Sequence, residues 1–220
     1  MNKTKTIIIC CPGDSFSGSF LRNLSYLVRH ISSKGFKIYF SAVYSRNIYE
    51  VRNKCLLGNP VKGEDQLPFN DINYDYILWI DNDMVFTPAD FDSLYDADKN
   101  VISGLYVMAN DREYAAVEDW DEDYFSENGT FEFIEKGSLR NRYLPFKVEY
   151  VGFGFILFKQ GVFEKLKYPW FEPTYLQIKE SRDFSMEDVT LCLKLKQNNI
   201  NVYVHPEVVL GHEKTVELKV

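Results

Sequence analysis

Two carboxylates follow a strongly apolar run near the middle of the chain. Residues 76–80 (YILWI) lead directly into Asp81-Asn82-Asp83. In open α/β sheets, ligands bind beyond the carboxyl ends of the strands, and this triplet falls at such an end. Carboxylate oxygens at positions i and i+2 can hold Mg2+ or Mn2+, which commonly bridge to phosphate oxygens. The alternative is an ordinary turn, because Asp and Asn favour turns in any case.

A second acidic pair, Glu187-Asp188, lies where a helix is expected to begin. A carboxylate at such a position can act as the general base that removes a proton from an attacking hydroxyl group. A structural alternative stays open at this point. Ser185 followed by Asp188 also fits a capping box, in which Asp188 only satisfies backbone donors.

Two histidines lie near the end of the chain. As a neutral imidazole, His212 can complete a metal site with the earlier carboxylates, although a histidine in this place is often a plain surface residue. His205, which precedes Pro206, is expected to be structural. The nucleotide motifs GxGxxG and GxxxxGK[ST] are absent, so dinucleotide and P-loop sites lose their main support.

The first half of the chain must position these groups by alternating strands and helices. Apolar runs predict strands at residues 6–11, 37–43 and 76–80, and apolar residues at helical spacing predict helices between them. Thr87, Pro88 and Asp90 have the residue types of a helix N-cap, first turn and capping box. This alternation predicts a parallel or mostly parallel sheet with right-handed crossovers.

The second half has a different pattern. Strands are predicted at residues 101–108, 150–158 and 201–205, and a helix from residue 185. Residues 111–147 are acidic, polar and weakly periodic, and an irregular segment of that length is usually functional or mobile. The run YVGFGFILF at 150–158 contains two glycines, which indicates that another group approaches its backbone closely.

The composition excludes several classes of protein. The 220 residues carry 25 Lys+Arg and 32 Asp+Glu, and a net charge of -7 makes nucleic acid an unexpected partner. Four cysteines without a CxxC pair indicate a reducing compartment. No apolar run approaches the roughly 20 residues of a membrane span, and no signal peptide is evident. We therefore expect a single domain over residues 1–220, located in the cytoplasm.

The order of these motifs resembles the GT-A-fold glycosyltransferases, in particular family-two-like enzymes and the small ones of large DNA viruses and phages. The resemblance covers roughly residues 6–212 and is carried by IDNDMVF, VGFGFILF, SMEDVTLCLK and HPEVVLGH. It implies an α/β GT-A fold, the fold of nucleotide-diphospho-sugar transferases, with a mostly parallel central sheet flanked by helices. It also implies a nucleotide-sugar donor and a glycan or glycoconjugate acceptor.

Matched position by position, the resemblance implies roles in binding the donor. Along the nucleoside and its phosphates it places Pro12, Gly13, Asp14, Tyr44 and Arg52. Around the donor sugar and as the floor of the site it places Ser103, Gly104, Tyr106, Gly152, Phe153 and Gly154.

The same matching implies the groups that carry out the reaction. Asp81, Asp83 and His212 correspond to ligands of Mn2+ or Mg2+, and Asp81 also lies where the ribose would be contacted. Asp188, with Glu187 beside it, corresponds to the base of inverting enzymes.

The expected function is therefore metal-dependent transfer of a sugar from a nucleotide diphosphate, with UDP as the expected nucleotide, to an acceptor hydroxyl with inversion. Two alternatives remain. IDNDMV also fits the motif of haloacid-dehalogenase-like phosphatases, in which Asp81 would be the nucleophile, although that strand normally opens the chain. The other alternative is a non-catalytic module that binds a sugar nucleotide or a glycan.

Overall fold

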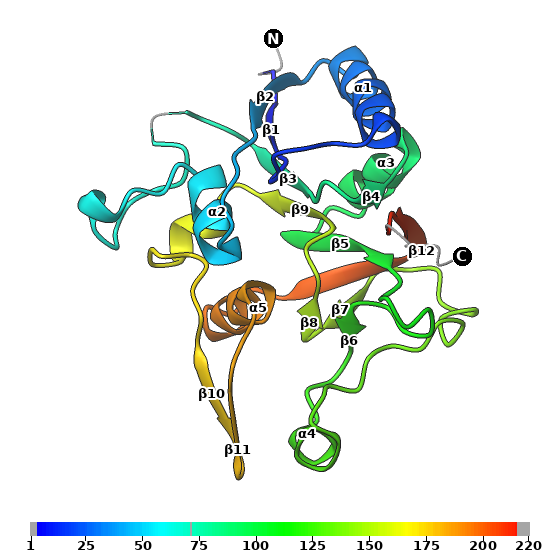
Figure 1. Cartoon of the computed structure of the whole chain (residues 1–220). Helices are drawn as coiled ribbons and strands as arrows, with labels where there is room; N and C mark the ends of the chain where they lie inside the picture. The colour runs from blue at the N-terminus through cyan, green and yellow to red at the C-terminus, as the bar shows by residue number, and fades with distance from the viewer. Residues whose placement is uncertain (1–3, 71, 215–220) are drawn as a thin grey trace, which may run out of the picture.

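The computed structural model describes residues 4–70 and 72–214. Its helices are α1 (Gly18–Ser33), α2 (Ile48–Cys55), α3 (Pro88–Asp96), α4 (Glu122–Asn128) and α5 (Glu187–Gln197), with 3-10 turns η1 (Pro60–Lys62) and η2 (Phe163–Lys165). Its strands are β1 (Thr6–Cys10), β2 (Lys37–Ser41), β3 (Tyr76–Ile80), β4 (Met84–Val85), β5 (Val101–Tyr106), β6 (Ala116–Val117), β7 (Phe146–Val148), β8 (Tyr150–Val151), β9 (Phe155–Lys159), β10 (Tyr175–Ile178), β11 (Ser181–Phe184) and β12 (Val202–His212). Figure 1 shows their arrangement.

Eight strands form the central sheet. Their hydrogen-bonded order is β2-β1-β3-β9-β5-β12-β4, and β7 also pairs with β12. The strands β2, β1, β3, β5 and β12 run in one direction, whereas β9, β4 and β7 run against them. The predicted α/β fold with a mostly parallel sheet is confirmed, and β9 is a reversed strand in its middle.

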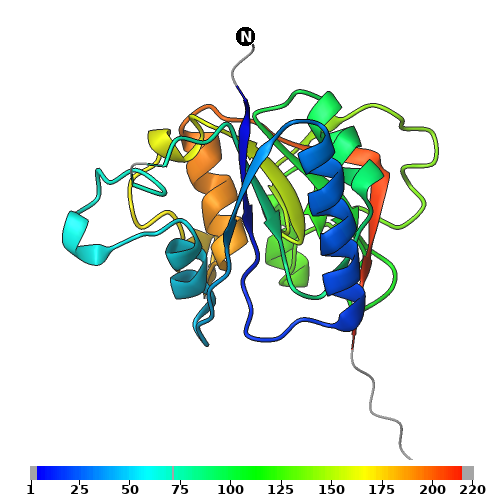
Figure 2. The same cartoon turned by 90° about the horizontal axis from the view of Figure 1, so that it is seen from above.

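Helices cover both faces of this sheet, as Figure 2 shows from above. The alternation of side chains along β1 explains the two cores: Ile7 and Ile9 face α1 and α3, whereas Ile8 and Cys10 face α2 and α5. All four of these side chains are buried. A strand covered on both faces reads as a continuous apolar run, which is why the sequence made these strands recognisable.

The predicted strand at residues 150–158 is two separate strands. β8 pairs with β6, and β9 pairs with β3 and β5. Gly152-Phe153-Gly154 connects them, and a Cβ atom on Gly152 would lie 2.0 Å from the hydroxyl oxygen of Tyr106. One on Gly154 would lie 2.7 Å from the ring of the same tyrosine. The close approach of another group, which the two glycines predicted, is therefore confirmed: the side chain of Tyr106 packs against the backbone at Gly152 and Gly154, where the chain turns.

The two predicted capping boxes have different outcomes. At α3, the carboxylate of Asp90 accepts hydrogen bonds from the backbone N–H and the hydroxyl of Thr87, at 2.7 and 2.8 Å. At α5 the N-cap is Met186, which makes no side-chain capping bond, and Ser185 bonds to Thr190 instead. The capping box predicted at Ser185 is therefore not formed, because the helix begins one residue later than that pattern requires, although Oδ1 of Asp188 does accept a hydrogen bond from the backbone N–H of Val189 at 2.8 Å.

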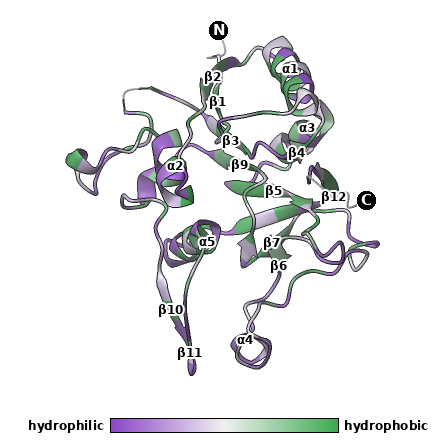
Figure 3. Cartoon of the chain, in the orientation of Figure 1, coloured by the Kyte–Doolittle hydropathy of each residue, from purple (hydrophilic) through white to green (hydrophobic). Residues whose placement is uncertain are grey.

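Parts of the segment between β5 and α5 lie outside the central sheet, although β7 and β9 of the same segment belong to that sheet. The outlying parts are α4, the short sheet β6–β8 and the projecting hairpin β10–β11. In Figure 3 the strands at the centre of the sheet are largely green, whereas α4 and the tip of the hairpin are mostly purple. Within the part of the chain that the structure describes, no helix combines the length and apolar composition that crossing a bilayer requires.

We predict that Gly152→Ala destabilises the protein, because the added methyl group overlaps the hydroxyl of Tyr106. Overpacking of this kind costs about 1–3 kcal/mol in free energy of unfolding, which urea denaturation measures. Gly18→Ala is the matched control, since nothing lies within 4 Å of its added Cβ atom. Equal stability of the two variants would contradict the contact.

Candidate active site

Strand pairing brings together Asp83 and His212, which are 129 positions apart in the chain. The last strand does not stop near His205 as the sequence suggested, but continues past Pro206 as β12 to His212. There it pairs antiparallel with β4, with His212 opposite Met84. As a result Nε2 of His212 lies 2.9 Å from Oδ2 of Asp83. The same oxygen accepts a hydrogen bond from Nζ of Lys214 at 3.0 Å.

The surroundings of His212 suit a metal ligand. Its Nδ1 lies 3.2 Å from the carbonyl oxygen of Val107, which can only accept, so we assign the ring proton to Nδ1. With the proton on Nδ1, Nε2 could offer its lone pair to a cation shared with the carboxylate of Asp83. Metal-binding histidines characteristically donate their other N–H to a carbonyl in this way.

The two residues alone make an incomplete coordination shell. Across residues 4–70 and 72–214, no group of three or more His, Cys, Asp and Glu side chains could hold a metal ion. Magnesium is commonly bound through one or two carboxylates together with substrate phosphates, and imidazole also suits transition metals. Asp83 and His212 therefore fit a divalent cation that arrives with a diphosphate.

Arg52 binds the first aspartate of the triplet. The side chain lies on α2 and is only 3% exposed. Its Nη1 and Nη2 donate to the two oxygens of Asp81 at 2.6 and 3.0 Å, and its Nε lies 3.4 Å from Oε1 of Glu187. The guanidinium also lies over the rings of Trp79 and Phe153, at 5.1 and 5.7 Å from their centroids.

These ion pairs engage the guanidinium of Arg52, and the contact with nucleotide or phosphates expected for it stays a prediction. Burial alone would lower the pKa of Arg52, but the carboxylates of Asp81 and Glu187 outweigh it and raise that pKa above its usual range. The pairing also occupies both oxygens of Asp81. A carboxylate held in this way is poorly placed to attack phosphorus, so the geometry does not favour the phosphatase alternative.

The acidic pair at the start of α5 lies in a poorly solvated environment. Burial raises the pKa of Glu187, and the neighbouring Asp188 raises it further, whereas Arg52 lowers it. Burial likewise raises the pKa of Asp188, and a hydrogen bond from Tyr150 partly offsets that rise. The hydroxyl of Tyr150 donates to Oδ2 of Asp188 at 2.9 Å. A carboxylate with a raised pKa and a fixed orientation is suited to accept a proton.

Tyr106 lies among these charged groups. It is at the carboxyl end of β5, packs on Gly152 and Gly154, and its ring meets that of His212 edge to face with centroids 5.1 Å apart. Burial raises its pKa, and the charge of Asp81 raises it further. Tyr106 thus contacts His212 and both glycines of the connecting loop, and the roles around the donor sugar and as the floor of the site that the resemblance implies for Tyr106, Gly152 and Gly154 stay predictions.

The loop after β1 contacts the Asp81-Asn82-Asp83 turn. The side-chain amide of Asn82 donates to the carbonyl oxygen of Ser15 at 3.0 Å. A Cβ atom on Gly13 would lie 2.9 Å from that amide nitrogen, so glycine permits the approach. Pro12 is buried and Asp14 exposed in the same loop. Tyr44, after β2, is 52% exposed and leaves its ring available, so these positions remain candidates for binding a nucleoside.

Three predicted donor contacts lie in the interior instead. Ser103 is fully buried in β5, where its hydroxyl donates to the carbonyl oxygens of Gly104 and Phe155. A Cβ atom on Gly104 would collide with Val208 and Leu210 of β12. The side chain of Phe153 is 1% exposed. These residues therefore support the sheet, and only the backbone at Phe153 belongs to the glycine loop beside Tyr106.

Sequence reasoning missed two residues of the site. Tyr150 was read only as part of a strand, although it lies two positions before Gly152 and so faces the same side of an extended chain. Lys214 was not considered, although it lies two positions after His212 and its Nζ donates a hydrogen bond to the same carboxylate, that of Asp83.

Comparison with known proteins identifies the fold. No family model matches the sequence, and no curated protein matches it either. Solved structures do match: GalNAc-T7 with UDP, GalNAc and Mn2+ superposes with a TM-score of 0.58 over 98% of this chain, at 10% identity. A mutant of Drosophila beta-1,4-galactosyltransferase 7, in complex with manganese, UDP-Gal and xylobiose, superposes with a TM-score of 0.51 over 96% of this chain, also at 10% identity. The chain has the GT-A fold.

The GT-A fold is shared with proteins longer than this chain. The matched region is 45% of the GalNAc-T7 chain and 72% of the galactosyltransferase chain. Sequence identity is too low to carry over more than the fold, so the activity must be argued from the residues at the ends of the GT-A strands. The resemblance to small transferases of large DNA viruses and phages stays an expectation from the motifs.

We predict that Arg52→Met lowers the free energy of unfolding near pH 7 by about 3–5 kcal/mol, because it leaves the carboxylates of Asp81 and Glu187 uncompensated in a buried place. Urea denaturation measures the change. Arg22→Met, on the exposed side of α1, is the control and should stay within about 0.5 kcal/mol.

The same comparison near pH 5 provides a second readout. A carboxyl whose pKa is raised in the folded state binds its proton there first, so its destabilising effect is present at high pH and relieved as pH falls. Removing Arg52 raises the pKa of Glu187 further, since that cation lowers it. The deficit of Arg52→Met should therefore shrink on acidification; a constant or growing deficit would contradict the ion pair with Glu187.

Proposed function

We propose that this protein is a metal-dependent glycosyltransferase that uses a nucleotide-diphosphate sugar, with UDP as the nucleotide. The observation that carries the proposal is the position of Tyr106 at the end of β5: its ring packs against His212, which pairs with Asp83, and its hydroxyl lies within range of the charge of Asp188. A candidate cation site and a candidate base are thus neighbours of one side chain. Manganese and UDP in both matched structures support the choice of metal and nucleotide.

Asp83 and His212 would hold Mn2+ or Mg2+ against the diphosphate. When bound, such a cation neutralises negative charge that develops on the leaving nucleoside diphosphate. The chain itself is acidic, with a net charge of -7, so a diphosphate needs local positive charge to bind. Lys214, which already reaches Asp83, adds a cation on the same side. Asp81, held by Arg52, shapes the turn and remains a proposed contact of the metal or the ribose.

Asp188 would act as the general base. Its carboxylate takes the proton of the acceptor hydroxyl as that oxygen forms a bond to the anomeric carbon of the donor sugar. The bond from this carbon to the phosphate oxygen breaks, and the nucleoside diphosphate leaves with the electron pair. Attack from the side opposite the leaving group inverts the anomeric centre. Glu187 holds the start of α5 against Arg52, so it would position Asp188 and not take the proton.

We predict that Asp83→Ala removes most of the Mn2+-dependent affinity for UDP. Loss of a direct ligand should exceed the about 10–100-fold that loss of an outer partner costs. Calorimetric titration with UDP, with and without Mn2+, measures it, and hydrolysis of UDP-Gal and UDP-GalNAc should fall in parallel.

Asp111→Ala is the matched control for this change, because that carboxylate is 84% exposed and bonded to Lys136. Undiminished metal-dependent binding of UDP by Asp83→Ala would reject the cation site. If UDP binds to the unchanged protein but no donor sugar is released or transferred, the non-catalytic binding module is the better description.

We predict that Asp188→Asn lowers donor-sugar turnover by about 10²–10⁴-fold while leaving UDP affinity nearly unchanged, because a general base contributes about that much to the rate. The pH profile of kcat/KM checks the assignment, since activity must rise with pH as the raised pKa of Asp188 is passed.

Tyr150→Phe is the milder companion variant. It removes the hydrogen bond that lowers the pKa of Asp188, so the rising limb of the profile should move to higher pH. An unmoved limb in this variant, or full turnover in Asp188→Asn, would assign the base to another group.

A further inference from the structure

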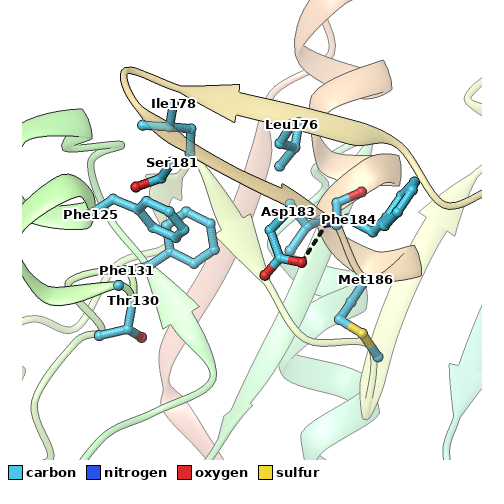
Figure 4. A pocket seen from close by; sticks show the side chains of 12 residues that line it. Phe125, Thr130, Phe131, Leu176, Ile178, Ser181, Asp183, Phe184 and Met186 are labelled. Atoms are coloured by element: carbon cyan, nitrogen blue, oxygen red, sulfur yellow. Dashed lines mark hydrogen bonds between the residues drawn. The ribbon is translucent and has the colours of Figure 1, made fainter.

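A pocket beside the start of α5 has no part in the site described so far. It lies between α4 and the hairpin β10–β11, and Figure 4 shows Phe125 and Phe131 on one side of it and Asp183, Phe184 and Met186 on the other. Its volume is about 200 Å3. Pockets for drug-sized ligands measure about 300–1,000 Å3, so this one has room for a single ring.

The pocket is connected to the candidate base in two ways, by residues that flank the base in the sequence and by an aromatic contact. Met186 and Val189 line it, and these residues flank Glu187-Asp188 in the sequence. On the opposite wall, the ring of Phe131 stacks against that of Tyr150 at an interplanar angle of 28° and a centroid distance of 6.4 Å. The hydroxyl of Tyr150 in turn bonds to Asp188. A ligand in the pocket therefore lies next to the residues that fix the base.

The walls are held together by polar contacts. Lys179, in the turn of the hairpin, forms an ion pair with Asp123 in the first turn of α4. At the mouth, the carboxylate of Asp183 is fixed by a hydrogen bond from the backbone N–H of Phe184 at 2.7 Å. Phe184 and Met186 are 64% and 57% exposed, which leaves apolar surface uncovered at the rim.

We propose that this pocket binds a neutral sugar ring of the acceptor, adjacent to the residue that receives the transferred sugar. The aromatic rings of Phe125 and Phe131 suit the apolar C–H face of a pyranose. The carboxylate of Asp183 and the hydroxyls of Ser181 and Thr130, which also line the pocket, suit the hydroxyl groups at its edge. The role as an acceptor subsite rests on the proposed transferase activity, whereas the binding of a sugar does not.

The test uses the whole chain without donor or metal. Methyl glycosides of glucose, galactose, xylose and N-acetylglucosamine are titrated individually by saturation-transfer NMR, and octyl glucoside is titrated as a probe with an apolar tail. At least one methyl glycoside should bind, and Phe125→Ala should raise its Kd about three- to tenfold, since an aromatic contact contributes about 0.5–1.5 kcal/mol. Asp183→Asn should weaken binding to a similar extent, because hydrogen bonds to a charged acceptor are about twice as strong.

Phe40→Ala is the matched control, because that ring is 52% exposed on β2, outside the residues that line the pocket. Phe125 is only partly buried, on α4 and away from the central sheet, so its loss should not unfold the protein, and release of sugar from the donor to water should be unchanged in Phe125→Ala. The proposal fails if no methyl glycoside binds, if Phe125→Ala binds as well as Phe40→Ala, or if only octyl glucoside binds, which would assign the pocket to an apolar group. Sugar binding that depends on Phe125 in a protein without donor turnover would overturn the acceptor role and the proposed function, but not the sugar site.

Discussion

A buried guanidinium joins the two halves of the candidate site. Arg52 connects Asp81, at the end of β3, to Glu187, at the start of α5, residues that are more than a hundred positions apart in the chain. Removing three charges from water is costly, and the arrangement is tolerable only because the bidentate pair has near-ideal distances and the cation lies against two aromatic rings. The position of the acidic pair relative to the Asp-Asn-Asp turn thus depends on one side chain.

The remaining geometry follows from which strands pair. β4 has only two residues, yet its pairing with the end of β12 sets the distance between Asp83 and His212. The reversed strand β9 lies between β3 and β5, so the glycine loop before it comes next to the ends of both. The order of the strands therefore makes the Asp-Asn-Asp turn, Tyr106 and the glycine loop neighbours.

The sequence was sufficient for the elements and for the kinds of residues at the site. Continuous apolar runs such as YILWI reveal strands covered on both faces, and the Thr87–Asp90 capping box is a local signal that the structure bears out. The sequence did not show that residues 150–158 form two strands in different sheets, because an apolar run with glycines has the same pattern in one continuous strand and in two strands joined by a turn. The spacing of apolar residues predicts which positions are buried. It could not predict the burial of Ser103 and Arg52, because a polar residue type does not show whether its hydrogen-bond partners lie in the protein interior.

Partners distant in the chain could not be predicted for the same reason. Nothing local to His212 specifies β4 as its neighbour, and nothing local to Asp188 specifies Tyr150; both follow from strand register and from the packing of α5. The resemblance to a known family supplied positions in order along the chain, and the roles it implies for Asp83, His212 and Tyr106 stay predictions. It could not indicate that Ser103 and Gly104 lie inside the sheet, because a matching position in a strand does not specify whether the residue faces a ligand or a neighbouring strand.

The reversed strand has one more consequence, which concerns how the site can change. A parallel strand brings only its last residues to this edge, and the chain then leaves through a crossover helix. β9 brings its first residues, and the chain arrives there from the short sheet β6–β8, which belongs to the irregular segment. The most variable kind of backbone therefore enters the site directly through the glycine loop, while the crossovers that stabilise the sheet lie elsewhere. In this architecture the specificity of the site can change through substitutions in the segment that precedes β9, while the central sheet and its crossover helices stay the same.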